Sequence, residues 1–440
     1  MSAPAEDVVV VGGGLAGAEA AWQALKMGAR VTLYEMRPSH PTPVHQTDRF
    51  AELVCSNSLK SNLLTNAAGL LKEEMRRFGS LICDAAEMAR VPAGEALAVD
   101  RIIFSGEITR RLEEHPNLTI RREEFTSLDQ ARGAPLVIAT GPLTSDALAA
   151  EIGTLTGTEQ LFFYDAVAPT IDASTIDREK VFAQSRYDKG GDDAYLNCPF
   201  NREEYDAFYE ALRHAELAPV HGHEAGTRYF EGCLPIEVLA SRGPRTLSFG
   251  PMKPVGLTDP RTGRRPWAAV QLRQENAAAT LYSMVGFQTR MKWGEQKRVF
   301  QMIPGLENAE FVRYGVIHRN TYIDSPKVLL PTLQARERPD VFFAGQITGV
   351  EGYVESAAAG ILAGRNAAAL ALGRELLVLP AETMLGSLIN YVSGYDGKDF
   401  QPMNSNWGIV PPMEDAPRDK REKARRMAER ALASLDAVLG

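Results

Sequence analysis

Cysteine is scarce in this chain, which has four among 440 residues: Cys55, Cys83, Cys198 and Cys233. No two of them have the spacing C-x-x-C, so the sequence encodes neither a zinc ribbon nor a thioredoxin-type redox couple. The same absence disfavours the flavoprotein reductases that act through two neighbouring cysteines. Free thiols are typical of a reducing compartment, and we therefore expect a cytoplasmic protein.

Long hydrophobic runs are also lacking. The first apolar run, residues 8–11, has no basic segment before it and ends at glycine, so we expect a strand there and no signal peptide. No run approaches the roughly 20 apolar residues that span a bilayer, and we expect no membrane association. Hydrophobic content of 45% and charged content of 24% are ordinary for a soluble enzyme. The length of 440 residues indicates two domains or one large interrupted domain.

Spacings typical of metal ligands are missing as well. The run His221-Gly222-His223-Glu224 contains side chains that bind metals, but no further ligand stands at helical spacing from it. We expect a polar loop there and no metal site.

A glycine-rich turn is the most informative feature that the sequence does contain. Four valines over residues 8–11 suit a strand that is buried on both faces. The next six residues are Gly12, Gly13, Gly14, Leu15, Ala16 and Gly17, with the glycine spacing G-x-G-x-x-G, and an alanine-rich helical pattern follows. In such a turn Gly12 allows the tight bend, Gly14 lets the backbone approach a pyrophosphate, and Gly17 lets helix and strand pack closely.

A second strand is expected over residues 30–36, and Glu35 stands near its end, 18 residues after Gly17. A carboxylate at this position accepts hydrogen bonds from ribose hydroxyls, while the helix N-terminus holds the phosphates. Arg37 could reach a 2′-phosphate, but the carboxylate of Glu35 argues against NADP at this site. Strand, turn, helix, strand and acid together predict a dinucleotide site, and the choice between FAD and NAD(P) must come from elsewhere.

Two later segments belong to the same fold. Residues 135–143, PLVIATGPL, read as a buried strand ending in Ala-Thr-Gly-Pro, a pattern of flavoproteins with two dinucleotide-binding folds. Residues 341–372 read as a strand, a glycine loop and a helix of small residues. There Gly345 and Gly349 permit close approach to a flavin, and Tyr353 is placed to cover its ring. The helix would direct its positive end at the anionic edge of a reduced flavin.

We therefore predict an α/β protein with a two-dinucleotide-binding, Rossmann-like FAD fold that is assembled from residues 1–165 and 314–440. An α+β insertion over residues 166–313 interrupts it and covers the active-site cleft. Within these parts the sequence predicts helices over residues 67–78, over residues 105–115 with Ser105 as the cap, and after Asn201.

Charge is distributed unevenly. The net charge of −8 speaks against a nucleic-acid partner, but residues 240–300 hold eleven Lys/Arg and three acids, a local charge of +8 that leaves −16 for the remainder. Six aromatic residues are interleaved there: Phe249, Trp267, Tyr282, Phe287, Trp293 and Phe300. Cations over phosphates and rings that stack on bases are typical of RNA recognition. A solvated basic face over an aromatic core fits the same composition, so both interpretations stay open.

Two of the cysteines are candidate nucleophiles. Cys55 lies in the small, polar run Cys-Ser-Asn-Ser with Lys60 nearby, whereas structural cysteines usually have apolar neighbours. Cys233 lies in a loop-like setting a few residues before the basic stretch. The surroundings of Cys83 and Cys198 are those of core or structural residues.

The segments GGGLAGAEAAW, EMRP, DRFAELVCSNSLKSN, FEGCLPIE and AGQITGVEGYVESAAAG together resemble the folate- and FAD-dependent tRNA (uracil-5-)-methyltransferases. The larger GidA-type flavoproteins that modify the wobble uridine share the fingerprint and the C-terminal glycine loop. The resemblance implies transfer of a one-carbon unit from 5,10-methylenetetrahydrofolate to C5 of the T-loop uridine of tRNA. It also implies reduction through FADH2, with NAD(P)H as the electron source. The two cysteines that this family uses fall on Cys55 and Cys233.

The chemistry explains why thiols are needed. C5 of uracil is a poor nucleophile until a thiolate adds at C6. We favour Cys233 for this addition because the basic stretch is close, which leaves the second thiol to hold the carbon in transit, protect the flavin or take the C5 proton. The addition needs an unstacked base, and we assign its presentation to residues 240–300.

Three alternatives remain from the sequence: an FAD-dependent oxidoreductase acting on a small molecule, a related flavoprotein that modifies another RNA uridine, and an RNA-binding module that keeps FAD as a structural part. The sequence indicates no stable protein partner.

Overall fold

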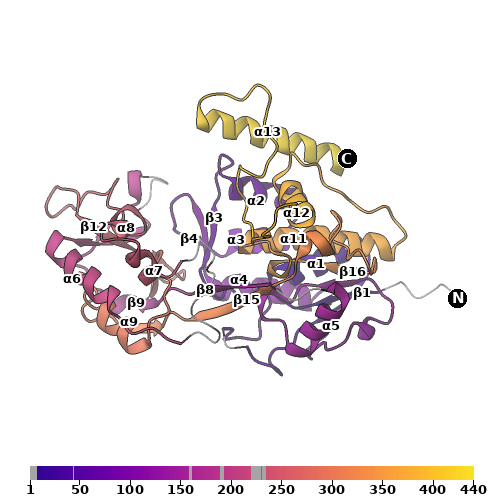
Figure 1. Ribbon diagram of the computed structural model, residues 1–440, viewed down its shortest axis with the longest axis horizontal. Coiled ribbons are helices and arrows are strands. Elements are labelled where there is room, and N and C mark those ends of the chain that lie inside the picture. The colour runs from indigo at the N-terminus through magenta and orange to yellow at the C-terminus, as the bar shows by residue number, and fades with distance from the viewer. Residues whose placement is uncertain (1–6, 43, 158–160, 189–192, 220–228, 230–233) are drawn as a thin grey trace.

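The computed structural model describes residues 7–42, 44–157, 161–188, 193–219, 229 and 234–440 (Figure 1). At its centre is a five-stranded parallel sheet with the order β16-β7-β1-β2-β6. Its strands are β1 (Asp7–Val11), β2 (Arg30–Tyr34), β6 (Leu118–Arg121), β7 (Leu136–Ile138) and β16 (Val341–Phe343). Strand β16 comes from the C-terminal part of the chain, so the sheet closes only when the two ends of the sequence meet.

Two helices pack against each other beside this sheet with their backbones almost in contact. They are α1 (Leu15–Lys26) and α11 (Tyr353–Ala371). A Cβ at Gly360 would overlap with the Ala16 carbonyl oxygen, and one at Gly364 would overlap with that of Ala20. The small residues of both helices therefore serve close packing, and they fix the N-termini of α1 and α11 near each other.

The remaining elements of this part surround the sheet. A three-stranded antiparallel sheet has the order β3-β5-β4, with strands β3 (Ser58–Ser61), β5 (Ala96–Val99) and β4 (Arg90–Val91). The helices are α2 (Ala67–Arg77), α3 (Leu81–Met88), α4 (Arg101–Glu113), α5 (Asp146–Thr156), α10 (Ser325–Val328), α12 (Met384–Gly394) and α13 (Lys420–Leu439). Helix α13 lies on the outside, at the top of Figure 1.

A second sheet lies to the left in Figure 1 and is antiparallel, with the order β10-β11-β12-β13-β9-β14. Its strands are β9 (Thr170–Asp172), β10 (Phe182–Ala183), β11 (Tyr195–Phe200), β12 (Ala268–Gln274), β13 (Leu281–Met284) and β14 (Phe311–Arg313). The helices beside it are α6 (Arg202–Arg213), α7 (Ile236–Ser241), α8 (Thr246–Phe249) and α9 (Trp293–Phe300). Its hydrophobic core is drawn from residues 171–309, separate from the larger core, which is drawn from residues 8–152 and 322–435.

Two antiparallel strands, β8 (Leu161–Ala166) and β15 (Ile317–Tyr322), connect the two parts. In Figure 1 they run between the antiparallel sheet and the parallel sheet. The boundary predicted after residue 165 falls within β8, and the one predicted after residue 313 falls at the end of β14, shortly before β15. Both stay predictions.

The helix predicted over residues 67–78 is confirmed as α2, and the one after Asn201 is confirmed as α6. Asn201 caps α6 because its side chain accepts from the Glu204 N–H. The helix predicted over residues 105–115, with Ser105 as the cap, is wrong at its start. Helix α4 begins at Arg101 because Asp100 accepts from two N–H groups of its first turn, and the Ser105 hydroxyl donates back to the Arg101 carbonyl instead.

A buried carboxylate caps α12 and predicts a pH-dependent stability. Glu74 accepts from the N–H groups of Met384 (2.7 Å) and Leu385 (2.8 Å), and burial raises its pKa from 4.5 to about 8. The folded state thus binds this proton more tightly than the unfolded chain, so the stabilisation is complete below the unfolded pKa and is lost as the pH rises toward 8. Between about pH 5 and pH 8 the free energy of unfolding of the wild type should fall by up to about 1.4 kcal/mol per pH unit because of Glu74. The Glu74→Gln variant should not show this fall.

Urea unfolding of the wild type and the variant over this pH range measures the difference. The matched control is Glu73→Gln, because that neighbour is partly exposed and pairs with arginines on the surface of α2. Parallel pH profiles for the wild type and Glu74→Gln would contradict the assignment.

Candidate functional site

The glycine turn between β1 and α1 leaves one position open to a ligand. Gly12 has φ of +100°, and a Cβ there would lie 2.5 Å from the Ala139 carbonyl oxygen. A Cβ at Gly17 would overlap with the Gly12 carbonyl oxygen. A Cβ at Gly14, in contrast, would meet nothing within 4 Å. The turn therefore needs glycine for its own geometry at Gly12 and Gly17, and its backbone is accessible from outside at Gly14.

A cavity of about 440 Å³ begins at this turn and extends to the antiparallel part of the molecule. Its lining includes Gly12, Gly14, Leu15, Ala16, Glu35, Arg37, Cys55, Ser56, Lys60, Thr140, Gly141, Arg273, Ser283, Gly286, Gly352 and Tyr353. Strands β1, β2 and β7 end at it, and ligands of open parallel sheets bind outside such carboxyl ends. The cavity thus joins the predicted dinucleotide turn, one predicted nucleophile and residues of the insertion.

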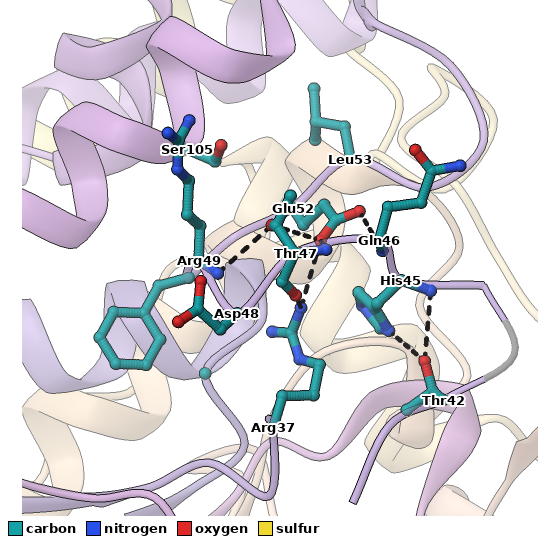
Figure 2. A network of polar contacts seen from close by, with 12 residues as sticks. Arg37, Thr42, His45, Gln46, Thr47, Asp48, Arg49, Glu52, Leu53 and Ser105 are labelled. Atoms are coloured by element: carbon teal, nitrogen blue, oxygen red, sulfur yellow. Dashed lines mark hydrogen bonds and ion pairs between the residues drawn. The ribbon is translucent and has the colours of Figure 1, made fainter. Parts of the chain in front are cut away.

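Glu35 and Arg37 form a buried pair at one end of the cavity. Glu35 accepts from the Gly13 N–H (2.8 Å) and from the Arg37 Nε (2.9 Å). Burial alone would raise the pKa of the Glu35 carboxyl, but the hydrogen bonds and charge of Arg37 outweigh it, so the pKa is lowered. Arg37 also contacts the Thr47 carbonyl oxygen and Glu52, as Figure 2 shows. Two carboxylates therefore surround this guanidinium, which disfavours a 2′-phosphate beside it.

Of the cysteines that the structure describes, Cys55 is the one that lines the cavity, and it is partly exposed. Cys83 and Cys198 are buried, as predicted, and burial raises the thiol pKa to about 12 for Cys83 and raises it further for Cys198. Cys233 lies outside the described residues, as does the run His221–Glu224. The described chain continues at Leu234, and the Ile236 N–H donates to the carbonyl oxygen of Gln288, a residue of the cavity lining.

The Cys55 loop is fastened to the start of α11. The Cys55 N–H donates to the Tyr353 hydroxyl at 2.6 Å, and the Ser56 N–H donates to the same oxygen at 3.2 Å. Tyr353 therefore both lines the cavity and fixes the thiol-bearing loop beside it. Burial raises the pKa of the Tyr353 phenol, so it stays neutral.

A partly buried ion pair joins this loop to the antiparallel part. Arg101, in the first turn of α4, donates to the Leu53 carbonyl oxygen at 2.7 Å and pairs with Glu275 at 2.7 Å. Burial would raise the pKa of Glu275, but Arg101 and Arg273 outweigh it and lower the pKa. Arg101 thus connects the Cys55 loop with the residue that follows β12.

Two further arginines reach the loop from the antiparallel sheet. Arg273 of β12 donates to the Ser56 hydroxyl and to the Asn57 side-chain oxygen, both at 2.8 Å. Arg313 of β14 donates to the Val54 carbonyl oxygen at 3.3 Å. Three guanidinium groups and one carboxylate therefore surround the loop, which leaves an excess of positive charge beside it. This cluster could not be predicted from local patterns, because its partners are separated by up to 259 positions.

The connection through Arg273 leads to a prediction. Arg273→Met removes both hydrogen bonds to the Cys55 loop. It leaves the Asn57 side-chain oxygen without its donor, while the Ser56 hydroxyl still accepts from the Ser58 N–H. For the one-carbon transfer that the resemblance implies, we expect a fall of roughly 10- to 100-fold with the expected flavin still bound, because small displacements of reacting groups cost about this much. The matched control is Arg265→Met, on the exposed surface of the same segment, which should weaken binding of the expected tRNA alone. Equal effects of both variants on turnover at saturating tRNA would contradict this role.

The C-terminal glycines have packing roles. Gly345 has φ of +80°, and a Cβ there would lie 2.6 Å from the Ala16 Cβ. Gly349 has φ of +81°, and a Cβ there would lie 2.6 Å from the Phe400 ring. Neither lines the cavity, whereas Gly352 and Tyr353 do. The approach of this loop to a flavin stays a prediction.

The basic stretch over residues 240–300 divides into a surface and a core. Phe249, Trp267 and Trp293 are exposed, and Arg245 lies over the Phe249 ring at 5.0 Å. Exposed cations accompany them: Arg242, Arg245, Arg261, Arg264, Arg265, Lys292, Lys297 and Arg298. The sequence left two interpretations open, and each holds for part of the stretch, because Tyr282, Phe287 and Phe300 belong to the core under the antiparallel sheet. Arg273 does not belong to the exposed surface either, because its guanidinium donates hydrogen bonds to Ser56 and Asn57 of the Cys55 loop.

Among the described residues no group of three or more His, Cys, Asp and Glu side chains is arranged to hold a metal ion. Within the same residues, no helix combines the length and the apolar character that crossing a membrane requires.

Comparison with known proteins gives consistent matches. Residues 7–375 match the profile of the family described as glucose inhibited division protein A. The chain is 60% identical over 430 residues to "Methylenetetrahydrofolate--tRNA-(uracil-5-)-methyltransferase TrmFO" of Exiguobacterium sp., covering 97% of this chain and 98% of that protein. A protein of the same name in Pelotomaculum thermopropionicum is 60% identical over 429 residues, covering 98% of this chain and 97% of that protein.

Solved structures agree with the fold. Two crystal forms of Aquifex aeolicus GidA superpose with TM-scores of 0.70 and 0.69, at 18% identity, over 98% of this chain. The superposed region covers 74% and 76% of the two GidA chains. The predicted fold class, a Rossmann-like parallel core with an added antiparallel part, is confirmed.

Proposed function

Because this chain belongs to the methylenetetrahydrofolate–tRNA-(uracil-5-)-methyltransferases within the glucose inhibited division protein A family, we propose that it methylates C5 of a uridine in tRNA. The carbon donor is 5,10-methylenetetrahydrofolate, and FAD with NAD(P)H supplies the reducing equivalents. The observation that carries the proposal is 60% identity along almost the whole chain, in a protein whose cavity joins a dinucleotide turn to a thiol. For the uridine we propose the one in the T loop.

The residues of the cavity fit FAD. The accessible backbone at Gly14 and the N-terminus of α1, which has no side-chain cap, provide N–H groups for a pyrophosphate. We propose that the turn from Gly12 to Gly17 holds it, with Glu35 and Arg37 at the ribose end and Tyr353 beside the ring. FAD bound there supplies the hydride that completes the methyl group.

The thiols act on the uridine. Addition of a thiolate to C6 makes C5 nucleophilic toward the methylene carbon of the folate donor. We assign this addition to Cys233, and Cys55 to the transit of the carbon, the protection of the flavin or the removal of the C5 proton. Support for a shared site comes from Cys55 in the cavity lining and from Ile236, which is bonded to the lining residue Gln288. The carbon then leaves the folate nitrogen and C5 loses its proton. Once a hydride has completed the methyl group, the C6–S bond breaks and the thiolate leaves.

We propose that the insertion, residues 166–313, presents the tRNA. Its exposed cations bind phosphates, and Phe249, Trp267 and Trp293 offer exposed rings for unstacked bases. A uridine must leave its stack before C6 can be attacked. Since tRNA and reduced thiols occur together in the cytoplasm, we propose that location.

Purified protein incubated with unmodified tRNA, labelled methylenetetrahydrofolate and NADH tests the proposal. Label in 5-methyluridine, mapped to the T loop after nuclease digestion, is the expected result. Label at a wobble uridine would contradict the assigned position. Flavin turnover without label would instead indicate an oxidoreductase of small molecules, and tRNA retention with neither would indicate a binding module.

A further inference from the structure

Lys60 has a backbone conformation that is unusual for its residue type. It lies in β3 and has φ of +61°, in the left-handed region that lysine rarely adopts. The pairing of β3 with β5 shifts register at this point. Such strain persists when neighbouring groups enforce it, and it concentrates at functional sites.

A second, buried lysine enforces this conformation. Lys72 of α2 is 1% exposed and donates to the carbonyl oxygens of Leu59 and Ser61, both at 2.7 Å. These two residues flank Lys60 on either side. Burial lowers the pKa of Lys72 to about 8, so the fold keeps a desolvated amine at this position to hold the neighbouring backbone.

The side chain of Lys60 is directed at the start of α11. Its Nζ lies 2.6 Å from Glu355 Oε1, and Lys60 itself lines the cavity. Glu355 is fully buried in the first turn of this 19-residue helix and also accepts from the N–H (3.0 Å) and the hydroxyl (2.6 Å) of Ser405. Its second oxygen, Oε2, is buried without a hydrogen-bond partner among the described residues.

The sign of the charge at this helix end depends on Lys60. The N-terminus of a helix is positive, and a carboxylate in the first turn offsets it. Gly352, Tyr353 and Val354, just ahead of Glu355, line the cavity, so this helix end faces the cavity. Without Lys60 the Glu355 carboxylate in the first turn of α11 would lose its cationic partner.

We propose that Lys60 is a positioning residue that neutralises Glu355 and thereby keeps the start of α11 positive, so that the site binds reduced, anionic FAD more tightly than oxidised, neutral FAD. The inference rests on the proposed function, because it requires FAD in this cavity. In this proposal Lys72 holds the strained backbone of Lys60, and Lys60 pairs with the buried Glu355. Together these groups set the balance between the two redox states of the cofactor.

The test is the ratio of affinities for reduced and oxidised FAD, obtained from the shift of the flavin midpoint potential between free and bound cofactor. We expect Lys60→Met to lower this ratio at least about tenfold and Lys60→Arg to change it less than about twofold. Glu355→Gln should raise the ratio, and Lys60→Met combined with Glu355→Gln should return it toward the wild-type value. Thermal unfolding of the flavin-free variants separates these changes from loss of structure.

An unchanged ratio in Lys60→Met, or an equally low ratio in the double variant, would overturn the inference. If Lys60→Met retains no flavin, Glu355→Gln alone decides: a raised ratio supports the inference and an unchanged ratio overturns it. If the wild type binds FAD and labels tRNA, but the wild type and all variants have the same affinity ratio, the role of Lys60 is refuted and the proposed function is not. A wild type that neither binds FAD nor labels tRNA would refute the proposed function.

Discussion

Cys55→Ala is expected to lose at least about a thousandfold of its one-carbon transfer to tRNA while it keeps FAD and its folded structure. The loss follows from position: Cys55 lies in the cavity that begins at the dinucleotide turn, held by the Tyr353 hydroxyl and surrounded by guanidinium groups. FAD should be retained because Cys55 is not part of the glycine turn at Gly14. Labelled transfer and flavin absorbance, measured on the same preparation, give both quantities.

Comparison with Cys233→Ala separates the roles of the two thiols. Both variants should lose transfer, but Cys55→Ala should still form a covalent complex with tRNA and Cys233→Ala should not, because we assign the C6 addition to Cys233. The matched control is Cys83→Ala, a buried thiol whose raised pKa keeps it protonated, and it should retain transfer. Normal transfer by Cys233→Ala, or a tRNA complex formed by it and not by Cys55→Ala, would contradict the assignment.

The second large effect concerns the glycine turn, where two substitutions should fail in different ways. Gly14→Val is expected to leave the unfolding free energy of the flavin-free protein within about 0.5 kcal/mol of the wild type, because a Cβ at Gly14 meets no atom within 4 Å. It should weaken FAD binding at least about a hundredfold, since its side chain projects where the pyrophosphate must approach.

Gly17→Ala should instead destabilise the flavin-free protein by about 3 kcal/mol or more, because its Cβ overlaps with the Gly12 carbonyl oxygen. Urea unfolding without flavin and FAD titration of the folded proteins measure the two effects. A Gly14→Val variant that binds FAD normally would show that the cofactor is not held at this turn. A normal stability of Gly17→Ala would contradict the packing described for β1 and α1.

Local patterns predicted much of the fold. Strand β1, the turn, α1, β2 and Glu35 follow one another in sequence, and each is specified by residues close along the chain, so they could be predicted from spacing alone. The same holds for α6, whose cap at Asn201 and apolar face are local. The resemblance to the folate-dependent methyltransferases rests on such segments and is confirmed by the comparisons.

Contacts between distant segments could not be predicted. Arg273 looked like part of a nucleic-acid surface, but its partners Ser56 and Asn57 are 217 and 216 positions away. The pairing of Lys60 with Glu355 spans 295 positions. Phe287 and Phe300 are aromatic, as stacking residues are, but they are buried in the core. Their burial depends on the packing of β12, α6 and α9. Ser105 is of a residue type that caps helices, but the cap is Asp100, whose carboxylate accepts from the N–H groups of Ile102 and Ile103.

A crystal structure of the FAD-bound protein tests the central claim most directly, namely that one cavity holds the dinucleotide, the Cys55 thiol and the cationic side of the insertion. We predict the pyrophosphate against the backbone at Gly14, and the isoalloxazine ring in van der Waals contact with Cys55 and next to the start of α11. A ring bound away from Cys55, or a pyrophosphate at any other turn, would contradict the account.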